Sequence, residues 1–281
     1  MAERRRARAL RDPLFLLGVA LVGVAVVVAV LAPWLAPHDP LIGDLKHAYL
    51  TPPGTKFLLG ADTQGRDVLS RLFYGARISL AVGVISQTVA VTLGVSLGLV
   101  AGYYGRWVDG TIMRLADVTL AFPTLLLLIA VSAAVRPPFL VVFVLIGIVG
   151  WAGMARLVRG QVLVLREAEY VQAARALGAP DHRILARHLL PNVRAQVIVA
   201  ATLGMAGAIM AEAALSFVGL GVQPPRPSWG AMVADGRELL RVAPWVSFAP
   251  GIAIGLTVLG FNLVGDGLRE AWDPRLAGRD R

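Results

Sequence analysis

Residues 166–192 read REAEYVQAARALGAPDHRILARHLLPN, a polar and basic stretch between two long apolar blocks. Apolar residues just before and inside it recur at helical spacing and predict one apolar stripe on a short helix: Leu163, Tyr170, Ala174 and Leu177. Gly178 then occupies the position of a helix C-cap, and Pro180 suits the first turn of a second helix, where no proline N–H is needed. We expect this second helix to end before Pro191, because proline disfavours a helical predecessor.

The predicted second helix separates its apolar residues from its basic ones. Ile184, Leu185 and Leu189 share one side, whereas Arg183 and Arg187 lie on another. A pair of helices this polar, flanked by segments that look membrane-embedded, has to lie in water or against another protein. The stretch is therefore predicted to be a docking element, and the alternative is an ordinary cytoplasmic loop of a polytopic protein.

The composition indicates a membrane protein. Of the 281 residues, 57% are hydrophobic and 16% are charged, and the mean hydropathy is +0.68. A soluble domain has about 45–50% apolar and about 25% charged residues, so lipid is expected to solvate most of this chain. The net charge of +9 is divided among segments between apolar runs, which argues against a nucleic-acid-binding domain.

Metal and disulfide chemistry has little support in the sequence. The chain has no cysteine, which excludes disulfides and thiolate metal sites. The histidines lie in connecting segments without metal-ligand spacing: His38, His47, His182 and His188.

The apolar runs predict six membrane-spanning helices. The first, residues 14–36, follows a basic arm of residues 1–13 and is long enough for a hydrocarbon core of about 30 Å at about 1.5 Å per residue. It lacks a convincing cleavage site, so we expect a retained span rather than a signal peptide. The other five lie within a core of residues 78–265, with expected bounds 78–101, 118–135, 139–155, 195–218 and 249–265.

The connections between these spans alternate between the two sides of the membrane. Three are expected on the extracytoplasmic side: 37–77, 136–138 and 219–248. Besides the N-terminal arm, the cytoplasmic side is expected to hold 103–114, 156–194 and the tail 266–281. Two-thirds of the 27 Lys and Arg residues then lie on the cytoplasmic side, in agreement with the positive-inside rule. Both termini are expected in the cytoplasm.

Small residues and one proline predict local features of the spans. Gly94, Gly98 and Gly102 recur at four-residue intervals and favour close helix packing in lipid, the alternative being a glycine-rich span without tight packing. Residues 103–114 suggest a short amphipathic helix at the membrane interface. Pro123 is expected to kink the third span.

The sequence shows no catalytic residue set. The G-x4-G-K-[ST] phosphate loop is absent, and the two lysines, Lys46 and Lys56, lie in the first extracytoplasmic connection. The zinc-binding pattern H-E-x-x-H is also absent. We therefore expect neither a catalytic site nor a metal site on this chain, and any nucleotide used in transport must be bound elsewhere.

Glu212 is a carboxylate inside the predicted fifth span. A charged carboxylate at the bilayer centre costs about 2.5–3.5 kcal/mol on insertion scales, so it should face a cavity or a partner, or be protonated. We hypothesise that Glu212 lines or supports the translocation path, and the alternative is a structural hydrogen bond to a neighbouring helix. Asp117, Asn262 and Asp266 lie near span ends, where snorkelling or capping is sufficient.

The docking element resembles the EAA loop of ABC importer permeases, E-A-A-x3-G-x9-I-x-L-P. The matching residues are Ala173, Ala174, Gly178, Leu190 and Pro191. Two positions depart from the pattern, because Gln172 replaces the glutamate and His188 replaces the branched aliphatic residue. Neither a carboxylate contact at 172 nor aliphatic packing at 188 is carried over.

Three further stretches resemble the second permease subunit of dipeptide/oligopeptide-type importers. They are GADTQGRDVLSRLFYGARISL (60–80), AEAALSFVGLGVQPPRPSWG (211–230) and FNLVGDGLREAWDPR (261–275). The basic arm and first span fit the same subtype, so the resemblance covers nearly the whole chain.

The resemblance implies an all-α polytopic protein of the inner (plasma) membrane with the type I ABC importer permease fold. Its implied partners are a homologous permease, an extracytoplasmic binding protein and two ATPase subunits that hold ATP and Mg. Closure of the ATPases would move the docking element, and the attached helices would switch a central cavity from outward- to inward-facing. Ala173 and Ala174 would pack in the ATPase cleft, Gly178 would form the turn, and Leu190-Pro191 would stop the helix.

Two other classes of protein fit the sequence less well. An ion-coupled carrier or channel would ordinarily contain more intramembrane ionisable groups than Glu212 supplies. A membrane enzyme would need a nucleophile–base pair that the sequence does not show. The expected cargo is a di- or oligopeptide, and nickel chelates, glutathione or another small solute such as a sugar remain alternatives.

Overall fold

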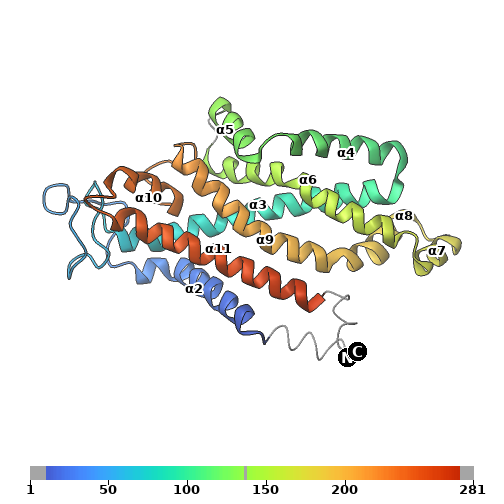
Figure 1. The fold of residues 1–281 in the computed structure, drawn as a ribbon, viewed down its shortest axis with the longest axis horizontal. Helices are drawn as coiled ribbons and strands as arrows, with labels where there is room; N and C mark the ends of the chain where they lie inside the picture. The colour runs from blue at the N-terminus through green and yellow to red at the C-terminus, as the bar shows by residue number, and fades with distance from the viewer. Residues whose placement is uncertain (1–10, 136–137, 273–281) are drawn as a thin grey trace.

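The computed structural model describes residues 11–135 and 138–272, which form a bundle of helices without named strands (Figure 1). The long helices are α2 (Pro13–Leu35), α3 (Val68–Tyr104), α6 (Phe139–Leu165), α9 (Leu190–Phe217) and α11 (Trp245–Trp272). Five helices are long and apolar enough to cross a membrane, with the fourth counted from Asp181, and a sixth span is present if one bent pair is counted. Most of the expected basic arm, residues 136–137 of the expected outer connection and the tail from 273 lie outside the described residues.

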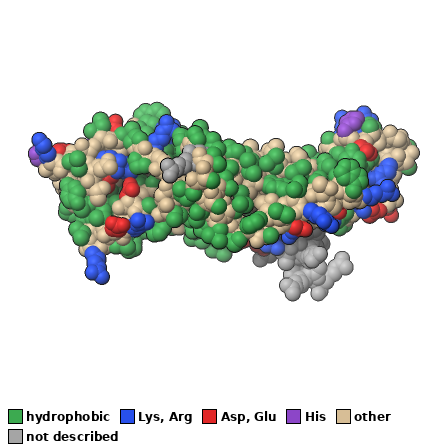
Figure 2. Space-filling model, turned by 90° about the horizontal axis from the view of Figure 1, so that it is seen from above, with side chains coloured by type: hydrophobic (Ala, Val, Ile, Leu, Met, Phe, Trp, Pro, Cys, Tyr) green, Lys and Arg blue, Asp and Glu red, His purple; other side chains and the backbone are tan. Residues whose placement is uncertain are grey.

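The long helices run along one axis, and different short elements close the two ends. Figure 1 shows α7 (Glu169–Ala176) and α8 (Asp181–Ile184) at one end, and α10 (Trp229–Gly236) at the other. Figure 2 shows a hydrophobic surface along the middle, with charged side chains gathered toward both ends. This distribution suits a body that crosses a bilayer and exposes both ends to water.

The closest packing in the bundle joins α3 to α6 through glycines. A Cβ atom on Gly94 would lie 2.5 Å from the Cβ of Met154, and one on Gly98 would lie 2.6 Å from the carbonyl oxygen of Ala155. Gly102 is equally close to Val162. The prediction of tight packing by these glycines is confirmed. Gly94 and Gly98 flank Ser96 in the G-x-S-x-G spacing of a nucleophile elbow, but the motif lies inside a helix and not at a strand-to-helix turn.

The first span packs against the last one. A Cβ on Gly18 of α2 would lie 2.7 Å from the Cβ of Leu263 and 2.9 Å from the carbonyl oxygen of Gly260, both on α11. The N-terminal helix is therefore an integral part of the bundle.

Several helices extend beyond the apolar windows that predicted them. At 37 residues, α3 is about 55 Å long, well over the roughly 30 Å of a hydrocarbon core. It begins at Val68, before the expected start at 78, because the Asp67 side chain accepts hydrogen bonds from the backbone N–H groups of Leu69 and Ser70. Likewise, α6 continues to Leu165, past the expected end at 155.

The expected third span has a different form in the structure. We predicted an interfacial helix at 103–114 followed by a span at 118–135 with a kink at Pro123. Instead α4 (Arg106–Ala121) and α5 (Thr124–Val135) are separate helices that meet at 86°. The break falls at Phe122-Pro123, where proline disfavours a helical predecessor and cannot donate a backbone hydrogen bond.

Ion pairs hold α4 along α6 (Figure 1). Arg159 donates to both carboxylate oxygens of Asp109, at 2.5 and 2.6 Å, and Arg156 donates to Asp117 at 2.5 Å. The 12 residues of α5 span only about 18 Å, which is less than a hydrocarbon core. The pair is therefore a sharply broken span or a re-entrant loop.

Candidate functional site

The predicted docking element folds as two helical segments joined by a glycine turn. After α7 ends at Ala176, Gly178 takes a φ of +78°, in the left-handed region that glycine adopts at little cost. The N–H of Gly178 donates to Arg175 O at 3.0 Å, and the N–H of Ala179 donates to Ala174 O at 3.1 Å. These two bonds form a Schellman cap, so the predicted turn at Gly178 is confirmed.

The predicted helix end before Pro191 is wrong. The chain continues from α8 through a π-helical turn, η1 (Leu185–Leu189), directly into α9, and Pro191 lies in the first turn of α9. The N–H of Leu190 donates to Leu185 O, five residues back, so the widened turn accommodates the proline ring. In the same turn, the carbonyl oxygen of His188 accepts a hydrogen bond from the Asn192 side-chain amide at 2.6 Å. The second helical segment of the docking element and the fifth span therefore form one continuous helix from Asp181 to Phe217.

The predicted apolar stripe does not lie on one short helix, because Leu163 belongs to α6 whereas Tyr170 and Ala174 belong to α7. Tyr170 and Leu177 are exposed, and Leu177 retains 88% of its accessible surface. The residue that α7 buries completely is Val171. Helical spacing alone does not show which apolar residue faces the bundle, because exposed apolar side chains also occur at a docking surface.

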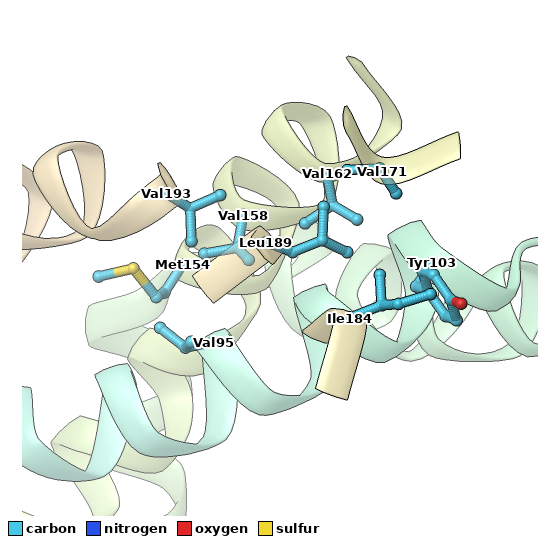
Figure 3. Close-up of a cluster of buried hydrophobic side chains, with 9 residues drawn as sticks. All are labelled: Val95, Tyr103, Met154, Val158, Val162, Val171, Ile184, Leu189 and Val193. Carbon is cyan, nitrogen blue, oxygen red and sulfur yellow. The ribbon is translucent and has the colours of Figure 1, made fainter. Parts of the chain in front are cut away.

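A buried hydrophobic cluster, the end cluster, fixes the docking element to the spans (Figure 3). It joins side chains of α3, α6, α7, α8, η1 and α9: Val95, Tyr103, Met154, Val158, Val162, Val171, Ile184, Leu189 and Val193. Ile184 and Leu189 are fully buried, as the predicted apolar side of the second helix requires. Burial of a side chain of this size stabilises the contact by about 1.5–3 kcal/mol relative to exposure.

Polar contacts add to the end cluster at the tip of α3. The Tyr103 hydroxyl donates to the Asp181 carboxylate at 2.6 Å, and the Arg175 guanidinium lies 5.2 Å from the centre of the Tyr103 ring. Arg166 donates to the carbonyl oxygen of Gly102 at 3.0 Å. The roles of Tyr103 and Asp181 could not be predicted from the sequence, because a single tyrosine after an apolar run has no distinctive pattern.

The outer surface of α7 presents small and apolar side chains to solvent. Gln172, Ala173 and Leu177 are exposed, whereas Ala174 is partly buried. The Gln172 amide donates to Glu167 O at 3.1 Å, so it closes the start of α7 without a carboxylate. An exposed surface that combines a small side chain with apolar ones on a rigid support is suited to a partner's cleft.

Glu212 lies in α9 near the α10 end of the bundle, and it is 1% exposed. Its Oε1 atom accepts from the Ser216 hydroxyl at 2.6 Å and from the Ser228 hydroxyl at 2.9 Å, and Ser228 is also the N-cap of α10. A Cβ on Gly230 would lie 2.5 Å from the Cα of Ala213, so α10 packs tightly on α9 at this point. These bonds join the two helices, and a role of Glu212 in the translocation path stays a prediction.

The family of the chain follows from comparison with known proteins. A family model described as the binding-protein-dependent transport system inner membrane component matches residues 94–278. The chain belongs to this family. A second model, described as the N-terminal TM domain of oligopeptide transport permease C, matches residues 4–53. The predicted resemblance is thereby confirmed, and the described helices adopt the type I ABC importer permease fold.

Curated relatives of this permease cover most of the chain. The dipeptide transport system permease protein DppC of Alkalihalophilus pseudofirmus is 44% identical over 264 residues, 92% of this chain and 86% of that protein. The di/tripeptide transport system permease protein DppC of Pseudomonas aeruginosa is 44% identical over 254 residues, 88% of this chain and 84% of that protein. The glutathione transport system permease protein GsiD of Pectobacterium atrosepticum is 47% identical over 224 residues, 80% of this chain and 74% of that protein.

Proposed function

We propose that this permease subunit forms, with a homologous permease, the path by which an ATP-driven importer takes up di- and oligopeptides. Peptide-transport names among the relatives support the cargo class, and the glutathione relative keeps that tripeptide as the alternative. Two separate ATPase subunits supply ATP hydrolysis and hold Mg, and an extracytoplasmic protein delivers the substrate.

The observation that carries the proposal is the construction of the docking element. Its outer surface is exposed at Ala173 and Leu177, while Val171, Ile184 and Leu189 anchor it in the end cluster. A force applied to α7 is therefore transmitted to α3, α6 and α9 through close-packed side chains, which resist compression. Movement of an ATPase cleft would displace these helices together.

The same reasoning orients the chain. A docking element that meets ATPases lies in the cytoplasm, so α10 and residues 37–67 lie on the extracytoplasmic side and both termini are cytoplasmic. The chain then resides in the cell membrane as a multi-pass protein.

Site-directed crosslinking tests this proposal directly, because the chain has no native cysteine. Single cysteines at Ala173 and Leu177, in cells that express the whole transport system, should crosslink to an ATPase subunit. Val242→Cys, at a residue that is 69% exposed at the α10 end, is the matched control and should not. Failure of both test positions to capture a nucleotide hydrolase would refute the coupling role.

A further inference from the structure

A pocket of about 320 Å³ lies at the α10 end, far from the docking element. Its walls come from the start of α3, the end of α9, α10 and the segment between α9 and α10. Pockets that hold small ligands have volumes of roughly 300–1,000 Å³, so this one suits a small molecule.

The lining of this pocket carries an excess of positive charge. Arg71, Arg226 and Arg237 contribute guanidinium groups, and Asp235 is the acidic residue among the described lining residues. Three cations against one anion favour a ligand with a negative group, and arginine presents a planar fork that matches a carboxylate.

Arg71 is held in place but is not fully used by its present partners. Its side chain is 4% exposed, and its ion pairs are long: 3.4 Å to Asp62 and 3.8 Å to Asp235. Arg66 takes the short bond to Asp62 instead, at 2.7 Å. A charge-assisted bond is about 2.7–2.9 Å long, so the Arg71 guanidinium retains capacity to bind a ligand carboxylate.

The other two arginines rest on aromatic rings. The Arg226 guanidinium lies 4.6 Å from the centre of the Phe139 ring, and that of Arg237 lies 5.5 Å from the Phe217 ring. Among the described residues neither forms an ion pair shorter than the 3.5 Å contact of Arg237 with exposed Glu238. Contact with an aromatic ring orients a guanidinium without using its N–H groups. Arg237 also donates to the carbonyl oxygen of Phe217 at 3.3 Å, and the five N–H donors of a guanidinium leave others for a ligand.

Asp235 faces the same pocket with a half-exposed carboxylate. Within residues 11–135 and 138–272 no hydrogen bond to its carboxylate is formed. Burial raises the pKa of the Asp235 carboxyl, while Arg71 and Arg66 oppose the rise. The three arginines form a site for an anionic group of a ligand. The Asp235 carboxylate lies beside that site and can accept hydrogen bonds from a cationic group of the same ligand.

We propose that this pocket binds a small zwitterion with a free carboxylate and a free ammonium group, such as a short peptide. Arg71, Arg226 and Arg237 bind the carboxylate, and Asp235 binds the ammonium group. The ligand class rests on the proposed function, but the site is separate from the docking element. The permease itself would then recognise the two ends of its cargo on the extracytoplasmic side.

Binding to the assembled transporter without its extracytoplasmic binding protein tests this site. Calorimetric titrations in nanodiscs compare dialanine, dialanine amide, which lacks the carboxylate, and N-acetyl-dialanine, which lacks the ammonium group. We expect the amide to bind at least about tenfold more weakly than dialanine, the effect of losing a charge-assisted hydrogen bond. Equal affinity for dialanine and its amide, or no binding of dialanine at all, overturns the proposal.

Substitutions assign the two ends of the ligand. Arg226→Gln and Arg237→Gln should weaken dialanine binding about tenfold and leave the amide unchanged, whereas Arg241→Gln, an exposed control outside the pocket lining, should alter neither. Asp235→Asn should abolish the preference for dialanine over its N-acetyl form. Arg71 is left intact because it belongs to the buried ion cluster.

The result of the dialanine binding experiments is independent of the result of the crosslinking experiment on the docking element. Selective dialanine binding together with absent crosslinks at Ala173 and Leu177 would retain the pocket and refute the coupling role. Crosslinks without selective binding would retain the coupling role and refute the pocket. Variants of Arg226 and Arg237 that bind dialanine like the wild type also refute it.

Discussion

Substitution of Gly178 tests whether backbone conformation or space dictates this position. The residue has a φ of +78°, and a Cβ built on it would meet nothing within 4 Å. Any cost of a side chain is therefore the cost of the left-handed conformation, about 1–2 kcal/mol for an ordinary L-residue. Such a cost shifts the equilibrium between the capped and the frayed turn by about 5- to 30-fold.

The expected order of damage among Gly178 variants follows from how well each residue tolerates the left-handed conformation, and not from the size of its side chain. Asparagine visits the left-handed region readily, so Gly178→Asn should behave almost like the wild type. Gly178→Ala should show the full shift, and Gly178→Val a larger one because β-branched residues are outliers there. In the Ala and Val variants we expect coupling of ATP hydrolysis to uptake to fail while membrane insertion persists.

Hydrogen exchange measures the shift directly. The Ala179 amide donates to Ala174 O at 3.1 Å only while the cap is formed, so its exchange should accelerate about 5- to 30-fold in Gly178→Ala. If Gly178→Asn proved as damaging as Gly178→Val and worse than Gly178→Ala, side-chain size would decide, and the conformational reasoning would be refuted.

Three further substitutions test other contacts. Gly98→Ala should lower the stability of the α3–α6 contact by about 1–3 kcal/mol in denaturation assays, because the added methyl group overpacks it. Gly153→Ala, on the open side of α6, is the control and should have little effect. Equal losses of stability in the two variants would contradict the close α3–α6 packing. Tyr103→Phe removes the hydroxyl that donates to exposed Asp181, which should cost less than about 1.5 kcal/mol of stability. The variant should hydrolyse more ATP per peptide taken up, because the docking element is held less firmly to α3. An unchanged ratio of ATP to peptide would contradict a role of this hydrogen bond in coupling. Glu212→Gln keeps an acceptor for both serines and should preserve folded yield but lower uptake; unchanged uptake at all substrate concentrations and pH values would remove Glu212 from the path.

Regular patterns in the sequence predicted the regular parts of this permease. Long apolar runs located five of the six expected spans, and the four-residue spacing of Gly94, Gly98 and Gly102 located a close helix contact. Gly178 predicted the turn after α7, because left-handed backbone conformations strongly favour glycine. Each of these signals comes from residues that are close together in the chain, so a single amino-acid sequence is sufficient to detect it.

The missed features depend on contacts between distant segments. Val171, and not Tyr170 or Leu177, is buried because α7 is rotated by packing against α3 and α6, which its eight residues do not encode. The tie between Tyr103 and Asp181 joins residues 78 positions apart. The expectation that the helix ends before Pro191 failed because the π-helical turn before it accommodates the proline ring.

That π-helical turn also sets the rotational phase of the fifth span. Each residue in an α-helix advances the direction of the side chains by about 100°, and a five-residue hydrogen bond contains one residue more than an α-helical one. The widened turn absorbs this surplus residue, so deletion of one residue within 185–189 would let the segment close as ordinary α-helix with little rotation of α9 relative to α8. If all five residues were wound as regular α-helix instead, α9 would turn by about 100° and Glu212 would point away from Ser228, so the π-helical turn keeps the two ends of the span in register.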